Sequence, residues 1–160
     1  MLTKEKLYAM KYLKSEYNRL QNHEYIWELG CTFALINNDI FHWKFSLTSP
    51  RDTPYEGGMF VLTIDFPEDY PHRRPEVRFT NKIYYLNVSP SDGHVNIIIL
   101  NNWKPKTTMI DIILDIYALF YNQNPFCPYS FQMAIEYQKN RKEFDRKAKE
   151  WTQKYASINV

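Results

Sequence analysis

The chain has 160 residues, of which 44% are hydrophobic, 24% charged and 17% aromatic. This length favours one domain spanning 1–160, and the composition supports a packed core rich in aromatic rings and excludes a disordered chain. A net charge of +2 is too small to indicate binding to nucleic acid or to an acidic membrane surface, and no apolar run reaches the roughly 20 residues of a membrane-spanning helix.

The N-terminal segment has the period of an amphipathic helix. Apolar residues recur at every third or fourth position and form one stripe, which consists of Leu7, Met10, Leu13, Tyr17 and Leu20. Lys4, Lys11 and Lys14 lie off this stripe. They form either a solvated face or a docking surface for a partner protein, and the pattern alone leaves both interpretations open.

Strand patterns occupy the chain from Thr32 to Phe79. Residues 41–48 alternate between apolar and polar, 59–66 are aromatic and β-branched, and 76–79 form a short fourth candidate. Turn-forming residues at 37–39, 49–54 and 67–75 separate these runs. Such short connections favour an antiparallel meander.

A long irregular stretch at 81–105 follows the strands, and a connection of this length within a compact domain is usually functional. A short apolar strand is expected inside it, at 95–100. Residues 108–122 predict a helix that is apolar on most sides and therefore buried against the sheet, with Thr108 and Asp111 forming its capping box. Helical spacing of charged residues continues through 130–155, so the sequence predicts an α+β fold.

No cofactor or metal is expected. The four histidines, at positions 23, 42, 72 and 94, are too far apart for metal-ligand spacing. The two cysteines, Cys31 and Cys127, give no disulfide framework, and residues 1–6 lack the apolar region of a signal peptide. Reduced thiols and a cytoplasmic or nuclear location are the expectation.

Several segments together resemble the ubiquitin-conjugating enzymes. They are Thr-Pro-Tyr-Glu-Gly-Gly-Met-Phe at 53–60, Asp-Phe-Pro-Glu-Asp-Tyr-Pro at 65–71 followed by Pro75, and Glu-Trp-Thr-Gln-Lys-Tyr-Ala at 150–156. The resemblance extends over roughly 7–156. It implies an N-terminal helix, a four-stranded antiparallel β-meander, a crossover helix and two C-terminal helices. It also implies a task, in which ubiquitin is accepted as a thioester on a cysteine and passed to a lysine or to another cysteine, with no cofactor in the enzyme itself.

The segment 83–103 resembles the active-site segment of that family, but four positions differ. The family's His-Pro-Asn motif reads Tyr85-Leu86-Asn87, and the nucleophilic cysteine is replaced by Asn96, three residues after Gly93. Two acidic positions of the groove become Ile98 and Cys127. An amide cannot carry a thioester, so the resemblance implies an enzyme variant without its nucleophile.

Other residues are weaker candidates for a catalytic role. Cys127 is a candidate for a displaced nucleophile, although an ordinary half-buried thiol is the simpler interpretation. Cys31 precedes the first strand and is a poorer candidate, and an isolated loop histidine such as His94 is usually solvated. Asn87, kept without its cysteine, is expected to fix the loop backbone rather than to stabilise an oxyanion.

Two partner surfaces follow from the resemblance. The ligase-facing loops fall near His72, Arg73, Trp103 and Pro105, where extra charge is expected to weaken a hydrophobic dock. The outer sheet face, where some members hold ubiquitin noncovalently, presents Thr32, Ser46 and Met59.

Three hypotheses remain open at this stage. The first is a catalytically inactive variant that acts as a binding or regulatory module, pairing with ubiquitin or a ubiquitin-like modifier, an active conjugating enzyme or a ligase. The second is an active enzyme that uses Cys127. The third is a structural interaction domain with no connection to ubiquitin.

Overall fold

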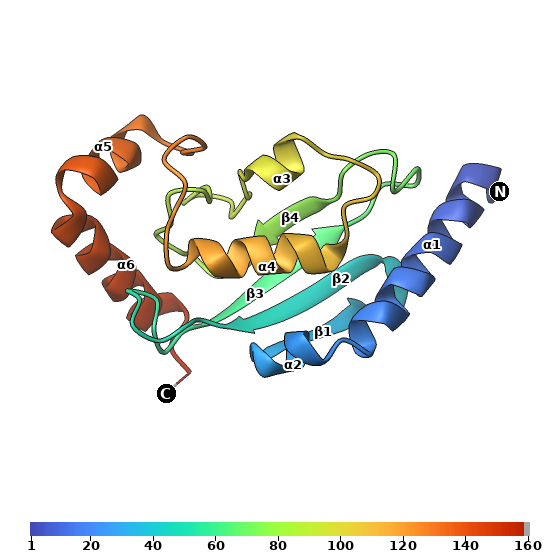
Figure 1. Ribbon diagram of the computed structural model, residues 1–160, viewed down its shortest axis with the longest axis horizontal. Coiled ribbons are helices and arrows are strands. Elements are labelled where there is room, and N and C mark those ends of the chain that lie inside the picture. The colour runs from blue at the N-terminus through green and yellow to red at the C-terminus, as the bar shows by residue number, and fades with distance from the viewer. Residues whose placement is uncertain (159–160) are drawn as a thin grey trace.

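The computed structural model describes residues 1–158, and its fold is the α+β arrangement that the sequence predicts (Figure 1). In chain order the elements are α1 (Lys4–Gln21), α2 (Glu24–Glu28), β1 (Cys31–Ile36), β2 (Asp39–Thr48), β3 (Met59–Asp65), β4 (Glu76–Phe79), α3 (Ile98–Asn101), α4 (Met109–Leu119), α5 (Phe131–Lys139) and α6 (Arg141–Tyr155).

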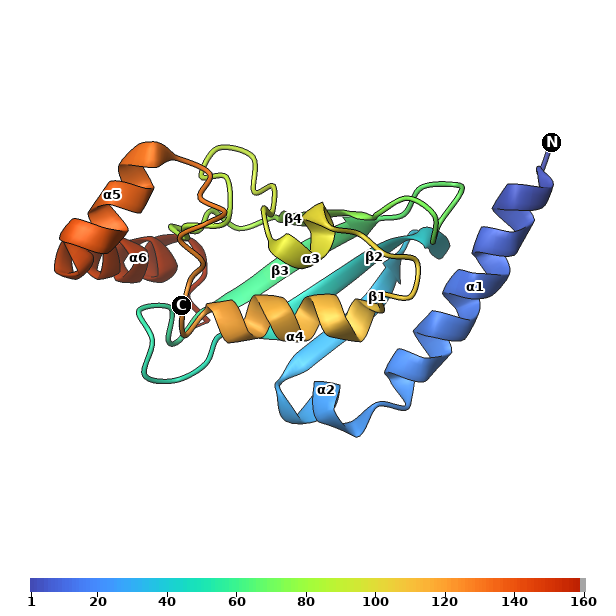
Figure 2. The ribbon, with the colours of Figure 1, turned by 45° about the horizontal axis from the view of Figure 1, so that its top comes forward.

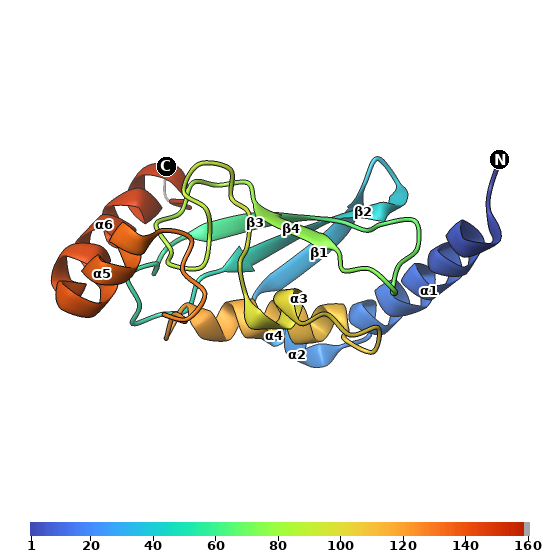
Figure 3. The ribbon, with the colours of Figure 1, turned by 90° about the horizontal axis from the view of Figure 1, so that it is seen from above.

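The four strands form one antiparallel meander in the order β1-β2-β3-β4. Phe45 on β2 lies opposite Phe33 on β1 and Leu62 on β3, so apolar side chains line up on one face of the sheet. Seen from above, α4 and α3 cover this face, while α1 lies at one end of the molecule and α5 and α6 at the other (Figure 3).

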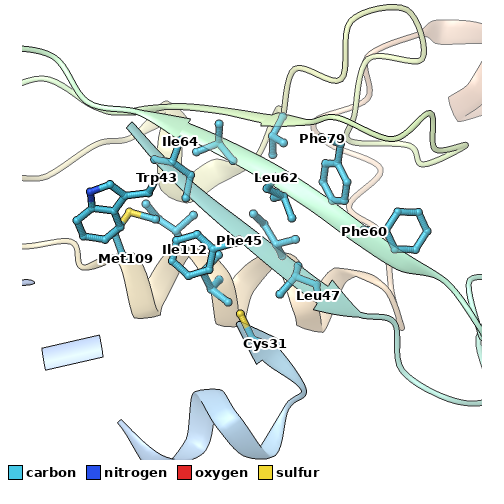
Figure 4. Close-up of a cluster of buried hydrophobic side chains, with 14 of the residues drawn as sticks. Cys31, Trp43, Phe45, Leu47, Phe60, Leu62, Ile64, Phe79, Met109 and Ile112 are labelled. Carbon is cyan, nitrogen blue, oxygen red and sulfur yellow. The ribbon is translucent and has the colours of Figure 1, made fainter. Parts of the chain in front are cut away.

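The core fills the space between the sheet and α4. Trp43, Phe45 and Leu62 point from the strands toward Met109 and Ile112 of the helix, and all five are fully buried (Figure 4). The helix keeps the predicted capping box, in which Thr108 and Asp111 each bond the other's backbone, although it ends at Leu119 rather than at 122. The prediction of a buried central helix is therefore confirmed.

The predicted strand at 95–100 is wrong. Val95 makes only an isolated bridge with Val88, and Ile98–Asn101 is a short helix. The buried residues of this run are Val95, Ile97 and Leu100. A short apolar run reads alike as a buried strand or as a buried helical turn, because its periodicity does not separate the two.

Residues 130–155 form the two C-terminal helices that the resemblance implies, and the Asn140 side chain caps α6 by accepting a hydrogen bond from the backbone of Glu143 at 3.3 Å. One further expectation about the helices needs correction. On α1, Leu7 of the predicted apolar stripe is 43% exposed, because the N-terminal part of the helix extends past the sheet (Figure 2). The short helix α2 was not predicted.

Glu16 on α1 is buried, which the stripe did not predict. Its carboxylate accepts hydrogen bonds from the Tyr70 hydroxyl at 2.9 Å and from the Met109 backbone at 2.6 Å, so it joins α1 to the loop after β3 and to the start of α4. Burial raises the pKa of Glu16 despite these two bonds, which favour the charged form.

Candidate functional site

The irregular segment at 81–97 is attached along the open edge of β4. Phe79 donates to the Gly93 carbonyl at 2.8 Å, and Val95 donates to the Val77 carbonyl at 3.2 Å. Gly93 has a φ of +77°, and a Cβ atom there would lie 2.0 Å from the Phe79 carbonyl oxygen. Only glycine permits this close approach, which fixes where the following residues, including Asn96, emerge.

Asn87 is buried where the segment 81–97 meets the loop after α4, the region that the resemblance assigns to the active-site groove and that we call the groove. Its Nδ2 donates to the carbonyls of Asn124 at 2.7 Å and Cys127 at 2.9 Å, and its Oδ1 accepts from the Asn124 backbone at 3.0 Å. The side chain is fully buried. All three hydrogen bonds of the Asn87 carboxamide are made to the loop after α4. Asn87 therefore ties this loop to the segment at 81–97.

Asn96 lies directly beside this brace. Its backbone donates to the Asn87 carbonyl at 2.7 Å, and its Nδ2 donates to the Cys127 carbonyl at 3.2 Å. Its Oδ1 accepts from Asn101 Nδ2 of α3 at 2.7 Å. The carboxamide at the position that the resemblance assigns to a nucleophile is therefore a connector between α3 and the loop at 122–128.

Tyr85 and Leu86, the two departures before Asn87, are part of the packing. Tyr85 is 1% exposed and its ring lies 5.6 Å from those of Tyr55 and Phe120. Burial raises the pKa of Tyr85 far above its usual value, and its hydroxyl has no hydrogen-bond partner among the described residues. Leu86 packs in a second cluster with residues of α5 and α6, namely Met133, Tyr137 and Phe144.

The two thiols differ in position. Cys127 is half-buried in the loop that forms one wall of the groove, where its carbonyl accepts from both asparagines. Cys31 is buried in the core under the sheet, and burial raises the pKa of its thiol to about 12 (Figure 4). A thiol with so high a pKa is unreactive at neutral pH. Of the two thiols, Cys127 is therefore the candidate nucleophile at the site.

His94 and Ile98 flank Asn96 in sequence, and neither forms a hydrogen bond with its side chain within residues 1–158. His94 Nε2 lies 2.7 Å from a carboxylate oxygen of Glu76 on β4, so the imidazole is engaged with the sheet edge. Ile98 begins α3 and is 49% exposed. Neither Ile98 nor Cys127 carries a charge, so the two positions that the resemblance assigns to acidic residues supply no carboxylate.

Sequence patterns missed two connecting residues. Gln123 is buried and its side chain accepts from the Leu86 backbone at 2.6 Å and donates to the Tyr55 hydroxyl at 2.7 Å. Asn101 holds Asn96, as described above. Both stand in polar runs that read as ordinary turn sequence, and only the folded contacts distinguish them.

Two of the residues predicted to face partners, Lys4 and His72, line the same hollow of the surface. A groove of about 380 Å³ is lined by residues of α1 and of the loop after β3, including Lys4, Tyr8 and His72. Arg73 is held by Asp69, whose two carboxylate oxygens each lie 2.8 Å from Nε. Trp103 is half-buried, and its indole donates to the Pro71 carbonyl at 2.8 Å.

The remaining residues predicted to face partners also lie at the surface. Lys11 and Lys14 are exposed on α1, and Pro105 is exposed near Tyr12, whose hydroxyl donates to its carbonyl at 3.3 Å. On the sheet, Thr32 lies opposite Ser46, and Met59, which is 41% exposed, begins β3.

No group of three or more potential metal-binding side chains occurs within residues 1–158. No helix in that same range is long and apolar enough to cross a membrane.

Comparison with known proteins decides the family. The family model described as ubiquitin-conjugating enzyme matches residues 12–152. The chain belongs to the ubiquitin-conjugating enzyme family. Solved structures agree with this assignment. The E2 domain of a Toxoplasma gondii ubiquitin-conjugating enzyme is 32% identical with a TM-score of 0.79, and the match covers 92% of this chain and 98% of that one.

A second solved structure, described as a ubiquitin-conjugating enzyme from Plasmodium yoelii, is 29% identical with a TM-score of 0.81 and is covered to 96%, against 93% of this chain. Both matches extend over nearly the full length of each chain, so the order of helices and strands in this member is that of the ubiquitin-conjugating enzyme fold.

Proposed function

We propose that this member of the ubiquitin-conjugating enzyme family forms no thioester at the usual position and acts as a binding or regulatory module in ubiquitin or ubiquitin-like modification. One observation carries the proposal: Asn96 stands at the nucleophile position, and its carboxamide is bonded to both Cys127 and Asn101. An amide nitrogen is not a nucleophile at neutral pH, and this one is also occupied by structural bonds.

The loading reaction tests the proposal directly. The chain is incubated with activating enzyme, ATP and ubiquitin, and the products are separated with and without reductant. An active conjugating enzyme in a parallel reaction shows that the reagents work. We expect no reductant-sensitive adduct on this chain. An adduct that disappears with reductant would overturn the proposal.

A second function has one specific observation in its favour. Cys127 lies on the wall of the same groove and is half-buried rather than buried, so an active enzyme could use its thiol in place of the lost one. Replacing Cys127 by Ser would then abolish loading. Loading that survives C127S would reject this alternative, and C31S serves as the matched control on the buried thiol.

Restoring the cysteine distinguishes two explanations for absent loading, namely the loss of the sulfur atom alone and the additional changes around it. If the Asn96→Cys variant accepts ubiquitin, only the sulfur was absent. If it does not, the replacements at Tyr85, Leu86 and Ile98 also contribute to the loss. Folding of the variant is checked by circular dichroism so that a failure to load is not a failure to fold.

A binding module needs a partner, and the exposed sheet face offers a test for ubiquitin. Thr32, Ser46 and Met59 lie on the side of the sheet away from α4. Titration of unlabelled ubiquitin into the isotope-labelled chain is expected to shift their amide resonances. Absence of any shift at millimolar ubiquitin would favour an active conjugating enzyme or a ligase as partner, or an interaction role without ubiquitin.

A further inference from the structure

Strand β1 is the outer strand of the sheet, so it pairs with β2 on one side only. In an antiparallel pair, alternate residues direct their backbone N–H and C=O groups to the partner strand, and the residues between them direct theirs outward. The Thr48 amide donates to the Gly30 carbonyl at 3.4 Å immediately before β1, so the residues two and four positions after Gly30 also bond β2. The backbone groups of Cys31, Phe33 and Leu35 therefore point away from the sheet.

These outward groups have no partner in the fold. Within residues 1–158 no hydrogen bond outside the sheet involves the backbone of Phe33 or Leu35, and both residues are only half-buried. The sequence of β1, Cys-Thr-Phe-Ala-Leu-Ile, also lacks the charged residues and prolines that commonly protect an outer strand. Its pairing with β2 is regular as far as Leu35. Such an edge is a template for one more strand, whose backbone would bond the outward groups.

Charged residues without an ion-pair partner stand at the two ends of this edge. Glu28 ends α2 three residues before β1 and is exposed. Lys14 of α1 is also exposed, and it shares a surface hollow with Leu35 at the other end of the strand. Neither Glu28 nor Lys14 forms an ion pair within residues 1–158. The carboxylate in that hollow, Asp39, lies 3.5 Å from His42 Nε2.

We propose that β1 binds β1 of a second copy of this chain, with the two strands antiparallel about a two-fold axis at Phe33. In this register Phe33 lies opposite Phe33 of the second copy and Cys31 opposite its Leu35, so the outward groups of each strand bond those of the other. The antiparallel direction also brings the Glu28 end of each copy to the Lys14 end of the other, and this contact is made twice. An unrelated strand would bond the same backbone groups, but the opposite charges at the two ends match this strand itself.

The association is expected to be weak. Five residues of strand span only about 17 Å, and a contact of this length falls below the roughly 1,200 Å² of standard stable complexes. A dissociation constant of about 10 µM to 1 mM is the corresponding range. This inference does not depend on the proposed function, because it concerns an edge of the sheet outside the Asn96 groove.

Sedimentation velocity of the whole chain, at concentrations from about 10 µM to about 1 mM, tests the proposal. We expect the average sedimentation coefficient to rise with concentration. Leu35→Pro should weaken association by at least about tenfold, because proline removes an outward N–H at two places in the interface and its ring occupies the edge. That N–H makes no bond to β2, so the fold tolerates its loss. Leu35→Val keeps the N–H and is the matched control, which should associate as the wild type does.

Charge substitutions test the direction of pairing. Lys14→Glu should weaken association by about fivefold, because it places two carboxylates together at both ends of the interface. The double variant K14E/E28K reverses both charges and should restore the association of the wild type. Lys142→Glu is the control for net charge, since Lys142 is exposed in α6 at the opposite end of the molecule from α1 (Figure 1). It should leave association unchanged.

A constant monomer at every concentration would overturn the proposal, as would equal association in L35P and L35V. Failure of K14E/E28K to restore association would overturn the antiparallel pairing, and so would a loss in K142E as large as that in K14E. Thermal unfolding of each variant verifies that it is folded. If L35P does not fold, the charge reversals, which lie on exposed side chains, decide the proposal.

Discussion

Replacing Asn87 by Ala tests whether this residue braces the groove. The substitution removes three hydrogen bonds, two donated by Nδ2 and one accepted by Oδ1. The Cys127 carbonyl keeps its bond from Asn96 and the Asn124 carbonyl keeps one from the Cys127 backbone at 3.4 Å, so the group left without a partner is the Asn124 amide. An unsatisfied buried polar group costs about 1–3 kcal/mol and each other lost bond about 0.5–1.5 kcal/mol, and Asn124 is only half-buried. We therefore expect a loss of about 2–4 kcal/mol in the free energy of unfolding.

Urea unfolding followed by tryptophan fluorescence measures this loss, and in thermal unfolding it corresponds to about 5–15 °C for a chain of this size. Asn122→Ala is the matched control: Asn122 lies in the same loop, is exposed and makes no side-chain hydrogen bond within the described part of the chain. It should change stability by less than about 0.5 kcal/mol. If N87A unfolds at the same urea concentration as N122A, the bracing role is refuted.

Three further substitutions check other parts of the fold by the same unfolding measurement. Gly93→Ala should lower the free energy of unfolding by at least about 3 kcal/mol, because its Cβ would clash with the Phe79 carbonyl. Gly57→Ala is the control: Gly57 also has a positive φ but open space around it, so the loss should be only about 1–2 kcal/mol, and equal losses would contradict the clash. Glu16→Gln should flatten the dependence of stability on pH, because the folded state binds the Glu16 proton more tightly than the unfolded state does. The stabilisation from this proton is full below the ordinary pKa of 4.5 and is lost as pH rises through the raised pKa of the folded state. A difference between wild type and E16Q that does not change with pH would contradict this assignment. Tyr85→Phe should leave stability unchanged or raise it by up to about 1 kcal/mol, because the hydroxyl is buried without a partner in the described structure; a clear loss would indicate an unseen hydrogen bond.

The regular spacing of apolar residues in the sequence predicted most of the fold. The strands at 41–48 and 59–66 and the buried helix after Thr108 have one dominant period each, and the structure places each within a few residues of its expected position. The failures occurred where the chain has no period of its own. Residues 97–100 are all apolar and show no alternation, and the neighbouring edge of β4 is filled by Gly93 and Val95. Ile98–Asn101 forms a short helix instead of a strand.

Asn96 and Asn87 could be located by comparing motifs, but their bonds could not. The Cys127 carbonyl accepts from both side chains across 31 and 40 residues of sequence. Polar residues in loops carry no periodic signal, and a partner so distant in the chain is fixed only by tertiary folding. For the same reason Gln123 and Asn101 were read as turn residues, although each holds part of the groove.

The bonds of Asn96 bear on what a single reverse substitution can achieve. Cysteine at this position would lose the acceptor that holds Asn101 and the donor to Cys127, because a thiol is a weak donor and a weak acceptor. The loop at 122–128 would then be held to the segment at 81–97 by Asn87 and by the bond from the Leu86 backbone to the Gln123 side chain. A gain of nucleophile in N96C is therefore coupled to a looser attachment of the loop at 122–128. Because Asn101 is exposed, water replaces the bond that its amide loses, so we expect N96C to lose only about 1 kcal/mol in the free energy of unfolding and N101S to lose less. If N101S loses as much as N96C in urea unfolding, the Asn96–Asn101 bond and not the bond to Cys127 is what the cysteine disrupts.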